Sequence, residues 1–332
     1  MKSRRVLLGI LLSIAGLLLC TAFSLAAGAR FVPVADVISA LLDSSIDTFD
    51  AVVVRERIPR TIFSLITGAA LGVSGILMQS ITRNPIADPS ILGVNSGAAL
   101  FVVCGIAYFG ITSAYQYIVF ALLGSAVTAV FVYGVGSIGK GGATPLKLAL
   151  AGTAAATALS SLTSIVMMPK DRVMDSFRFW QIGSVSGGTY EKIIAFIPFF
   201  LIGTVLAICL SPQLNVLALG DDAATGLGAK PAHIRLLGAF AGVFLCGAAT
   251  ALAGPIGFVG LMVPHVMRLL LGNDMRILVP MSAMGGAVLL TASDIIGRLL
   301  GGTGEIEVGI VTAVLGGPIF VIIAMRTKVK AL

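Results

Sequence analysis

The stretch TIFSLITGAALGVSGILMQSI, residues 61–81, contains no charged side chain over its whole length. A helix needs about 20 mainly apolar residues to cross the hydrocarbon core of a membrane, and this stretch is that long. It is also rich in glycine, whose small size lets helix backbones approach each other closely in lipid. Residues 61–81 therefore predict a membrane-spanning helix that packs closely against its neighbours.

The rest of the chain has the same character. Of its 332 residues 57% are hydrophobic and only 11% are charged, its mean hydropathy is +1.04, and it contains 40 glycines. A soluble globular domain has about 25% charged residues, so the composition excludes that class. A membrane β-barrel would show alternating segments of about ten residues, and the sequence shows none. The composition predicts an all-α, polytopic membrane protein with one transmembrane domain over residues 1–332.

Ten spans account for the apolar runs. The first run is too long for the apolar core of a cleaved signal peptide, which has about 7–15 residues. The run from 236 to 271 is too long for one straight helix and is broken by Gly254-Pro255, so we divide it there. The predicted spans are 6–29, 61–81, 91–112, 116–138, 146–168, 193–211, 236–253, 257–271, 277–293 and 308–325.

The basic residues predict the orientation of the chain. Ten is an even number, so both ends lie on the same side, and both ends are basic. With the ends inside, the inner loops and helix ends hold 13 of the 22 basic residues and 4 of the 15 acidic residues. This agrees with the positive-inside rule, so we expect both termini to be cytoplasmic. The net charge of +7 then reports orientation and contact with membrane lipid rather than binding of nucleic acid.

An internal similarity divides the ten spans into two groups of five. GAALGVSG at 68–75 resembles GAATALAG at 247–254, and at the same offset Pro85 meets Pro264. The similarity pairs the second span with the seventh, and this odd separation reverses the direction through the membrane. The sequence thus predicts two inverted five-helix halves, at about 1–168 and 189–332, as in many transporters.

One stretch, YGVGSIGKGG at 133–142, comes close to a nucleotide-binding loop. Gly134, Gly139 and Lys140 fit the pattern G-x-x-x-x-G-K, but Gly141 stands where Ser or Thr would bind magnesium. A phosphate-binding loop follows a strand, whereas this stretch follows a predicted membrane helix. We expect no nucleotide binding here, so any energy for transport has to enter from a partner.

The inner connection RNPIADPSILG, residues 83–93, is more than a short hydrophilic loop. Pro85 and Pro89 break the helix between the second and third spans. Broken backbone at membrane depth is tolerated where protein buries it or water lines it. The segment is therefore either a constriction of a pathway or a tight turn.

The longest inner connection, residues 212–235, predicts a short helix outside the membrane. Asp221 and Asp222 suit the first turn of a helix, where they face its positive end, and Gly226 or Gly228 can end it. Such a helix between two spans is either a docking surface for a partner or a solvated connector.

Hydroxyl side chains follow one face of the predicted span 146–168. Their spacing is i, i+4, i+7, i+8 and i+11, which places them together on a helix. They either line a substrate pathway or donate back to their own helix, which is common in membrane helices. The residues are Thr153, Thr157, Ser160, Ser161 and Ser164.

Arginines on the predicted outer side run against the orientation rule. Arg57 and Arg60 flank Pro59 at the predicted start of the second span, and Arg298 is expected in the last outer loop. These arginines either meet acidic groups of an external partner or reach the phosphates of membrane lipids.

The sequence shows no arrangement of catalytic or metal-binding residues. His233 and His265 stand alone, and the acidic residues form no pair with ligand spacing. The four cysteines lie inside apolar runs and are interpreted as small core residues. We expect no catalysis, no cofactor and no metal site in this chain.

Several long stretches resemble one family, the FecCD-type permeases of ATP-driven importers for iron–siderophores, haem and vitamin B12. They cover most of the chain in the family's order: RIPR, GAALGVSGILMQSITRNPIADPSILGVNSGA, LALGDDAATGLG, GPIGFVGLMVPHVMRLLLGNDMR and VGIVTAVLGGPIF. The chain differs at Glu307, where the family usually has proline, which leaves the start of the last span open.

The resemblance implies a location in the bacterial plasma or inner membrane and three kinds of protein partner. A homodimer of ATPase subunits would bind on the cytoplasmic side, and an extracellular or periplasmic substrate-binding protein would bind outside. A second permease subunit, identical or related, would complete the transport path between the two permeases.

The resemblance also implies a role for each candidate residue. Asn84, Pro85 and Ile86 would form the inner gate. Arg57, Arg60 and Arg298 would bind acidic residues of the external binding protein, and Thr153, Thr157, Ser160 and Ser164 would line the pathway. The 217–232 loop would couple to the ATPase through Leu219, Gly220, Asp221, Asp222, Ala223, Ala224, Gly226 and Gly228.

Within this family an iron–siderophore is the favoured substrate because such members are commonest, with haem and vitamin B12 as alternatives. A second alternative is a transporter driven by an ion gradient. It would bury ionisable residues at mid-membrane, and the first five predicted spans have none away from their ends. An intramembrane enzyme would need paired catalytic groups inside the spans, and the sequence has none.

Overall fold

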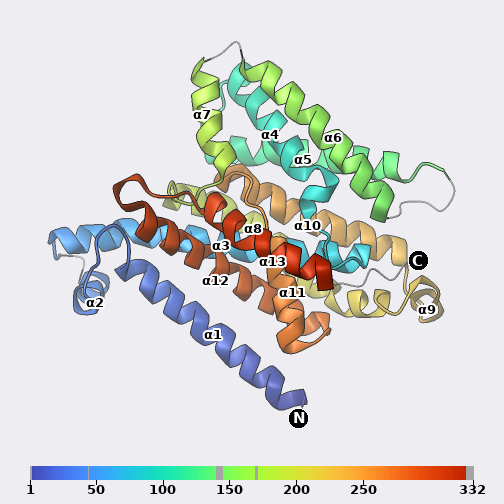
Figure 1. Cartoon of the computed structure of the whole chain (residues 1–332), viewed down its shortest axis with the longest axis horizontal. Coiled ribbons are helices and arrows are strands. Elements are labelled where there is room, and N and C mark those ends of the chain that lie inside the picture. The colour runs from blue at the N-terminus through green and yellow to red at the C-terminus, as the bar shows by residue number, and fades with distance from the viewer. Residues whose placement is uncertain (1, 44, 140–144, 169–170, 327–332) are drawn as a thin grey trace.

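The structure, a computed structural model, describes residues 2–43, 45–139, 145–168 and 171–326. Almost all of these residues are helical, and none of them forms a strand (Figure 1). The predicted all-α class is confirmed.

Within the described residues, seven helices are long and apolar enough to cross a membrane. They are α1 (Lys2–Ala26), α3 (Phe49–Thr82), α5 (Ala114–Gly136), α6 (Pro145–Met167), α8 (Tyr190–Leu217), α10 (Pro231–Ala253) and α12 (Met275–Gly301). Three shorter apolar helices are α4 (Val94–Cys104), which continues as a π-helical turn over Gly105–Phe109, α11 (Val259–Leu271) and α13 (Val308–Arg326). Every one of the ten predicted spans coincides with one of these helices.

Shorter helices occupy the connections between the spans. They are α2 (Val34–Leu42), η1 (Pro89–Leu92), α7 (Asp171–Ile182), α9 (Asp221–Gly226) and η3 (Gly302–Gly304). The short helix predicted between Asp221 and Gly226 is therefore present. The last span begins at Val308 as predicted, although Glu307 replaces the family's proline, and the Glu307 carbonyl accepts the first helical bond from Ile310 N at 3.0 Å.

The predicted start of the second span was wrong. Helix α3 begins at Phe49, where the Thr48 side chain accepts a hydrogen bond from Ala51 N, so Pro59 lies inside the helix rather than at its start. The first turns of α3 carry charged residues, and a helix that leaves the hydrocarbon is no longer marked by apolar residues.

The glycine-rich stretch 68–75 lies at the centre of the molecule. A Cβ atom at Gly68 would collide with the backbone of Gly286 in α12, and one at Gly75 would collide with Gly260 in α11. Glycine is required at these crossings because any side chain would push the helices apart. Helix α3 is consequently buried over most of residues 63–81 and organises the core.

The two parts of the chain pack on each other reciprocally. Helix α3 contacts α11 and α12, while α10 contacts α4 and α5. The matching glycine of α10, Gly247, faces Ser125 of α5. The second span thus packs on the ninth and the seventh on the fourth, which is the arrangement expected of a repeat, and the division into inverted halves stays our interpretation.

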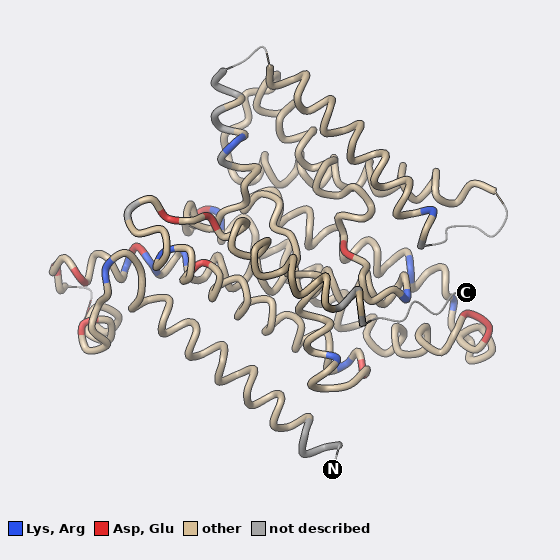
Figure 2. The backbone as a smooth tube through the Cα atoms, viewed as in Figure 1, with Lys and Arg blue, Asp and Glu red and all other residues tan. Residues whose placement is uncertain are grey.

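Figure 1 shows α4, α5, α6 and α7 as a group on one side of α3 and α10, with α1 on the opposite side against α12. Many of the charged residues lie toward the two ends of the long axis (Figure 2). One end holds the start of α3 and the end of α12, and the other holds α9. We call them the arginine end and the α9 end.

The stretch that resembles a nucleotide-binding loop follows helix α5, which extends to Gly136. A helix thus precedes it where a phosphate-binding loop needs a strand. Lys140 and Gly141 lie outside the described residues.

Candidate functional site

A hollow of about 640 Å³ runs along helix α6. The hydroxyl residues of the predicted stripe line it, and all of them are exposed in the single chain. Ser90 and Ile91 of η1, at the end of the 83–93 segment, close its other wall. The hydroxyls that line the hollow are those of Thr153, Thr157, Ser160, Ser161 and Ser164.

The hydroxyls also bond to their own helix. Thr153 Oγ1 donates to Ala149 O at 2.8 Å, Thr157 Oγ1 to Thr153 O at 2.9 Å, and Ser164 Oγ to Ser160 O at 3.0 Å. Thr153, Thr157, Ser161 and Ser164 thus line the hollow and also donate to their own helix, while a role of the stripe in a substrate pathway stays a prediction. The wall is weakly polar and carries no charge.

The predicted gate residues lie between α3 and η1. Asn84 Oδ1 accepts a hydrogen bond from Ile86 N at 3.1 Å and so closes a tight turn around Pro85, and all three residues are half-buried. Arg83, just before them, ends α3 in the left-handed conformation with φ of 51°. The turn is confirmed, and its role as a gate stays a prediction.

Asp221, at the first position of α9, joins three segments. Its carboxylate accepts hydrogen bonds from Arg235 Nη1 and Nη2, both at 2.9 Å, and from the guanidinium of Arg83. Arg83 also donates to Leu217 O at the end of α8, and Arg235 donates to Ile81 O in α3. We call Arg83, Asp221 and Arg235 the Asp221 bridge, which ties α9 to the ends of α3 and α10.

The Asp221 bridge lies at the surface. The side chains of Asp221, Arg83 and Arg235 are 44%, 35% and 34% exposed. Partial burial alone would raise the pKa of Asp221, but the guanidinium groups of Arg235 and Arg83 outweigh it and hold this pKa below its usual value. The remaining predicted coupling residues, among them Leu219 and Asp222, lie on or beside α9, and only Ala224 is buried.

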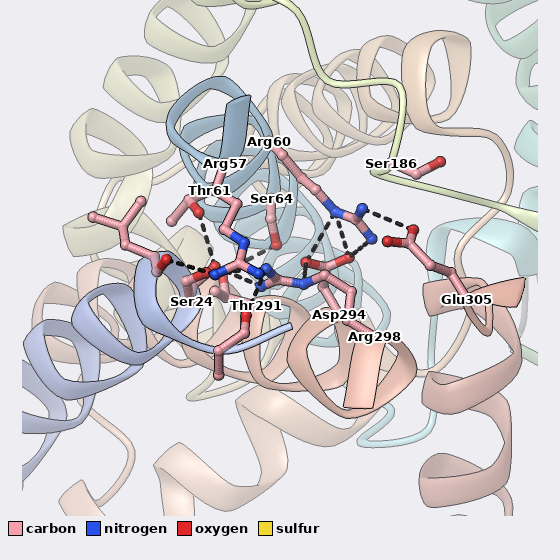
Figure 3. A network of polar contacts seen from close by, with 12 residues as sticks. Ser24, Arg57, Arg60, Thr61, Ser64, Ser186, Thr291, Asp294, Arg298 and Glu305 are labelled. Carbon is pink, nitrogen blue, oxygen red and sulfur yellow. Dashed lines mark hydrogen bonds and ion pairs between the residues drawn. The ribbon is translucent and has the colours of Figure 1, made fainter. Parts of the chain in front are cut away.

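A second cluster of charged side chains lies at the arginine end (Figure 3). We call it the arginine network, and its members are Arg57, Arg60, Asp294, Arg298 and Glu305. Arg57 Nη1 donates to Leu25 O and Ala26 O, both at 2.9 Å, and Arg298 Nη1 donates to Ser24 O and Ala27 O at 3.0 and 2.9 Å. The carbonyls of Ser24, Leu25 and Ala26 belong to the last turn of α1 and that of Ala27 follows it, and none of the four has a partner within the helix. The two guanidinium groups therefore cap α1, where the helix dipole favours positive charge.

Asp294 and Glu305 balance part of this positive charge. Arg60 Nη2 donates to Asp294 Oδ1 at 2.7 Å, and Arg60 Nη1 donates to Glu305 Oε2 at 2.8 Å. Arg298 Nε lies 3.0 Å from Asp294 Oδ2 as an ion pair, although its N–H does not point at the oxygen. Asp294 and Arg298 are each only 3% exposed, so one buried carboxylate serves two arginines.

The expected positions of two outer arginines were wrong. Arg298 lies inside α12 rather than in a loop, and both Arg57 and Arg298 are buried, at 9% and 3% exposure. Their donors are used by the end of α1, a contact between segments far apart in sequence. Arg60 is 14% exposed and faces Glu305, which is 37% exposed, so this pair is the part of the network nearest to the surface.

The predicted site residues did not include Arg83, Arg235, Asp294 or Ser90. The available signal was weak: Arg83 precedes the proline segment, and Asp294 lies four residues before Arg298, which is pairing distance on a helix. Among the described residues no group of His, Cys, Asp and Glu could hold a metal ion.

Comparison with known proteins identifies the family. A model of the FecCD transport family matches residues 14–326. The ferric enterobactin transport system permease protein FepD of Escherichia coli (strain K12) is 41% identical over 311 residues, which are 93% of this chain and 92% of that protein. The hemin transport system permease protein HmuU of Yersinia pestis is 34% identical over 279 residues, which are 82% of each chain.

A solved structure of an ABC transporter of the metal-chelate type, in an inward-facing conformation, has the same fold. Its TM-score is 0.81 at 29% identity, and the match covers 98% of this chain and 100% of that one. Sequence and structure agree that this is a multi-pass membrane component of the permease type, and the chain belongs to the FecCD transport family.

Proposed function

We propose that this chain is the permease subunit of a binding-protein-dependent ABC importer that moves an iron–siderophore complex inward. The hydroxyl-lined hollow along α6 carries this proposal, because it follows a predicted membrane span and is lined by hydroxyl side chains and by no charged residue. A wall of this kind lets a large polar chelate pass without holding it.

The choice of substrate rests on the relatives. The relative named for ferric enterobactin is 41% identical, and one from Bacillus subtilis named for Fe(3+)-citrate is 42% identical over 272 residues. The relatives named for hemin and cobalamin are 34% and 36% identical. Iron chelates are therefore favoured, and haem and vitamin B12 are the alternatives.

A second permease subunit follows from the exposure of the hollow. The hydroxyl residues of α6 are exposed in the single chain, and a row of polar side chains facing lipid is unfavourable. A second subunit placed against α6 would cover them and enclose the path between the two chains. The structure leaves identical and related subunits equally suitable.

Helix α9 supports a coupling role toward an ATPase. It lies between α8 and α10 at the α9 end, and the leucines that flank it, Leu219 and Leu227, are each 66% exposed. Exposed leucines beside Asp222 suit a protein contact on the cytoplasmic side. The Asp221 bridge would carry a movement of α9 to Arg83 and from there to the gate segment Asn84-Pro85-Ile86.

Docking of an external binding protein belongs at the arginine end. Arg60 is the best placed of the three predicted arginines, because Arg57 and Arg298 are occupied by α1. An acidic side chain of the binding protein would approach Arg60 next to Glu305. Arg57 and Arg298 then stabilise the helices beneath this surface through their bonds to the end of α1.

Uptake by a deletion strain tests the function. Cells lacking the native permease and expressing this chain with its partner ATPase and binding protein are given labelled ferric siderophore, haem or cobalamin. We expect uptake of the ferric siderophore only, and its loss when the catalytic residues of the ATPase are replaced. Uptake of haem or cobalamin alone would overturn the substrate, and uptake that persists without an active ATPase would overturn the mechanism.

A further inference from the structure

A separate pocket of about 360 Å³ lies away from the α6 hollow, toward the arginine end of the molecule. It is formed where the first turns of α5 and α8 and the last turn of α10 meet α7 and the loop that follows it. The lining residues that the argument uses are Thr112, Tyr117, Trp180, Ser184 and Lys192.

Among the described residues that line this pocket, Lys192 alone is charged. Among the residues that the structure describes, its ammonium group has no ion pair, and its neighbour Glu191 is not part of the lining. Lys192 lies in the first turn of α8, where the helix dipole disfavours a cation. The position is also on the predicted outer side, where lysine is disfavoured.

The other polar groups of the pocket can donate hydrogen bonds. Tyr117, Thr112 and Ser184 contribute hydroxyls, and Ser184 Oγ lies 2.7 Å from Ser186 Oγ. Trp180 forms an apolar wall, fixed by its Nε1–H bond to Ala251 O at 2.9 Å and by the ring of Phe177 at 5.4 Å. A cation and several hydroxyls beside a fixed aromatic ring are complementary to an oxyanion joined to an apolar body.

We propose that the Lys192 pocket binds a phosphate oxyanion from the outer side, with Lys192 as its counter-ion and Tyr117 as a hydrogen-bond donor. The phosphate of a lipid headgroup and free inorganic phosphate are two sources of this chemistry. The site is distinct from the α6 hollow and does not depend on the transported substrate. A bound anion there would fix the start of α8 against the ends of α5 and α10.

The fluorescence of Trp180 reports on this site, because Trp180 lines the pocket and is the only tryptophan in the sequence. The full chain is purified in a maltoside detergent, which contains no phosphate. Its tryptophan emission is followed during titration with inorganic phosphate at constant ionic strength, and separately with phosphatidylglycerol added to the micelles. A neutral diacyl glycolipid serves as the lipid control.

We expect a saturable change of emission with at least one phosphate source and none with the glycolipid. Replacing Lys192 with Gln should weaken binding about tenfold or more, as for the loss of one charge-assisted hydrogen bond, while Lys192→Arg should keep most of it. Tyr117→Phe should weaken binding less, and Lys230→Gln, an equal loss of charge at the α9 end, should leave it unchanged.

The two arms identify the source of the phosphate. A response to phosphatidylglycerol alone assigns a lipid headgroup, and a response to inorganic phosphate alone assigns a soluble anion. No saturable response in either arm overturns the proposal, and so does a response that Lys192→Gln leaves intact. Because Lys192→Arg and Tyr117→Phe keep the size of the side chains, they separate loss of binding from loss of folding.

Discussion

The two polar clusters at the ends of the molecule use the same chemistry in opposite surroundings. In the arginine network Asp294 serves Arg60 and Arg298, and in the Asp221 bridge one aspartate serves Arg83 and Arg235. The carboxylate is 3% exposed in the first and 44% exposed in the second. Equal contacts should therefore contribute very different free energies.

Burial decides what each cluster can do. Removing one partner of a buried ion pair leaves an uncompensated charge and costs about 3–5 kcal/mol, whereas an exposed pair contributes about 0–1 kcal/mol. The arginine network is accordingly a fixed joint between α1, α3 and α12. The Asp221 bridge is weak enough to break and form again, which suits a part that transmits movement.

Replacing Asp294 with Ala should produce the largest effect. It removes the only buried carboxylate of the arginine network and should lower the free energy of unfolding by about 3–5 kcal/mol. The thermal midpoint of the purified chain in detergent, followed by circular dichroism, measures the change. Asp221→Ala is the matched control, since it removes the same group from the exposed cluster.

The comparison fails if Asp294→Ala and Asp221→Ala lower the midpoint equally. Such a result would mean that water or lipid headgroups screen Asp294 as well as they screen Asp221.

Releasing the end of α1 should have the next largest effect. Arg298→Gln takes the charge out of the bonds to Ser24 O and Ala27 O, and this loss should cost about 1.5–3 kcal/mol in total. Helix α1 should then loosen from α12, and Cys20 of α1, whose Sγ lies 3.7 Å from Val288 O, should react faster with a maleimide. Unchanged labelling in a variant with the other three cysteines replaced would contradict the capping role.

Asp221→Asn should change stability by less than about 1 kcal/mol because the bridge is exposed. Since the pKa of Asp221 is lowered in the folded protein, its contribution is present above about pH 4 and is lost as the pH falls through the folded value. The difference in midpoint between Asp221→Asn and the unchanged protein should therefore be constant from pH 6 to 8. A difference that grows between these values would show that another group titrates in the bridge.

The same Asp221→Asn protein separates stability from coupling. If the bridge transmits movement, ATP-driven uptake should fall several-fold while the midpoint and the binding of the ATPase stay close to normal. Asp36→Asn, which removes an exposed carboxylate on α2 away from the bridge, is the control. Equal uptake by both variants would assign the bridge a purely local role.

The smallest effect on stability is expected at the α6 hollow. Thr157→Val exchanges a hydroxyl bonded to its own helix for a methyl group of similar size, so the free energy of unfolding should change by less than about 0.5 kcal/mol. Uptake should nevertheless fall if Thr157 lines the path. Thr163→Val, which removes the equivalent bond of a buried residue outside the hollow, should leave uptake unchanged.

Much of the candidate site could be predicted because its signals are local. The hydroxyl stripe of α6 follows from helical spacing, and the helix Asp221–Gly226 follows from two acids and a glycine within six residues. The turn at Asn84-Pro85 follows from proline. Their neighbours could not be predicted, since Arg83 meets Asp221 across 138 residues and Arg60 meets Asp294 across 234.

The class of the protein and its ten apolar helices could be predicted from the sequence, because hydrocarbon selects long uncharged helices whatever their partners are. Its family could be predicted from long sequence motifs, and the family model confirms it. Only the tertiary structure decided the use of the charged residues. Arg57 and Arg298 look in sequence like surface residues beside a membrane, and they are buried because the open carbonyls of α1 reach them in space. The free energy that a charged side chain contributes depends on its surroundings, and these surroundings come from segments that are far apart in the sequence.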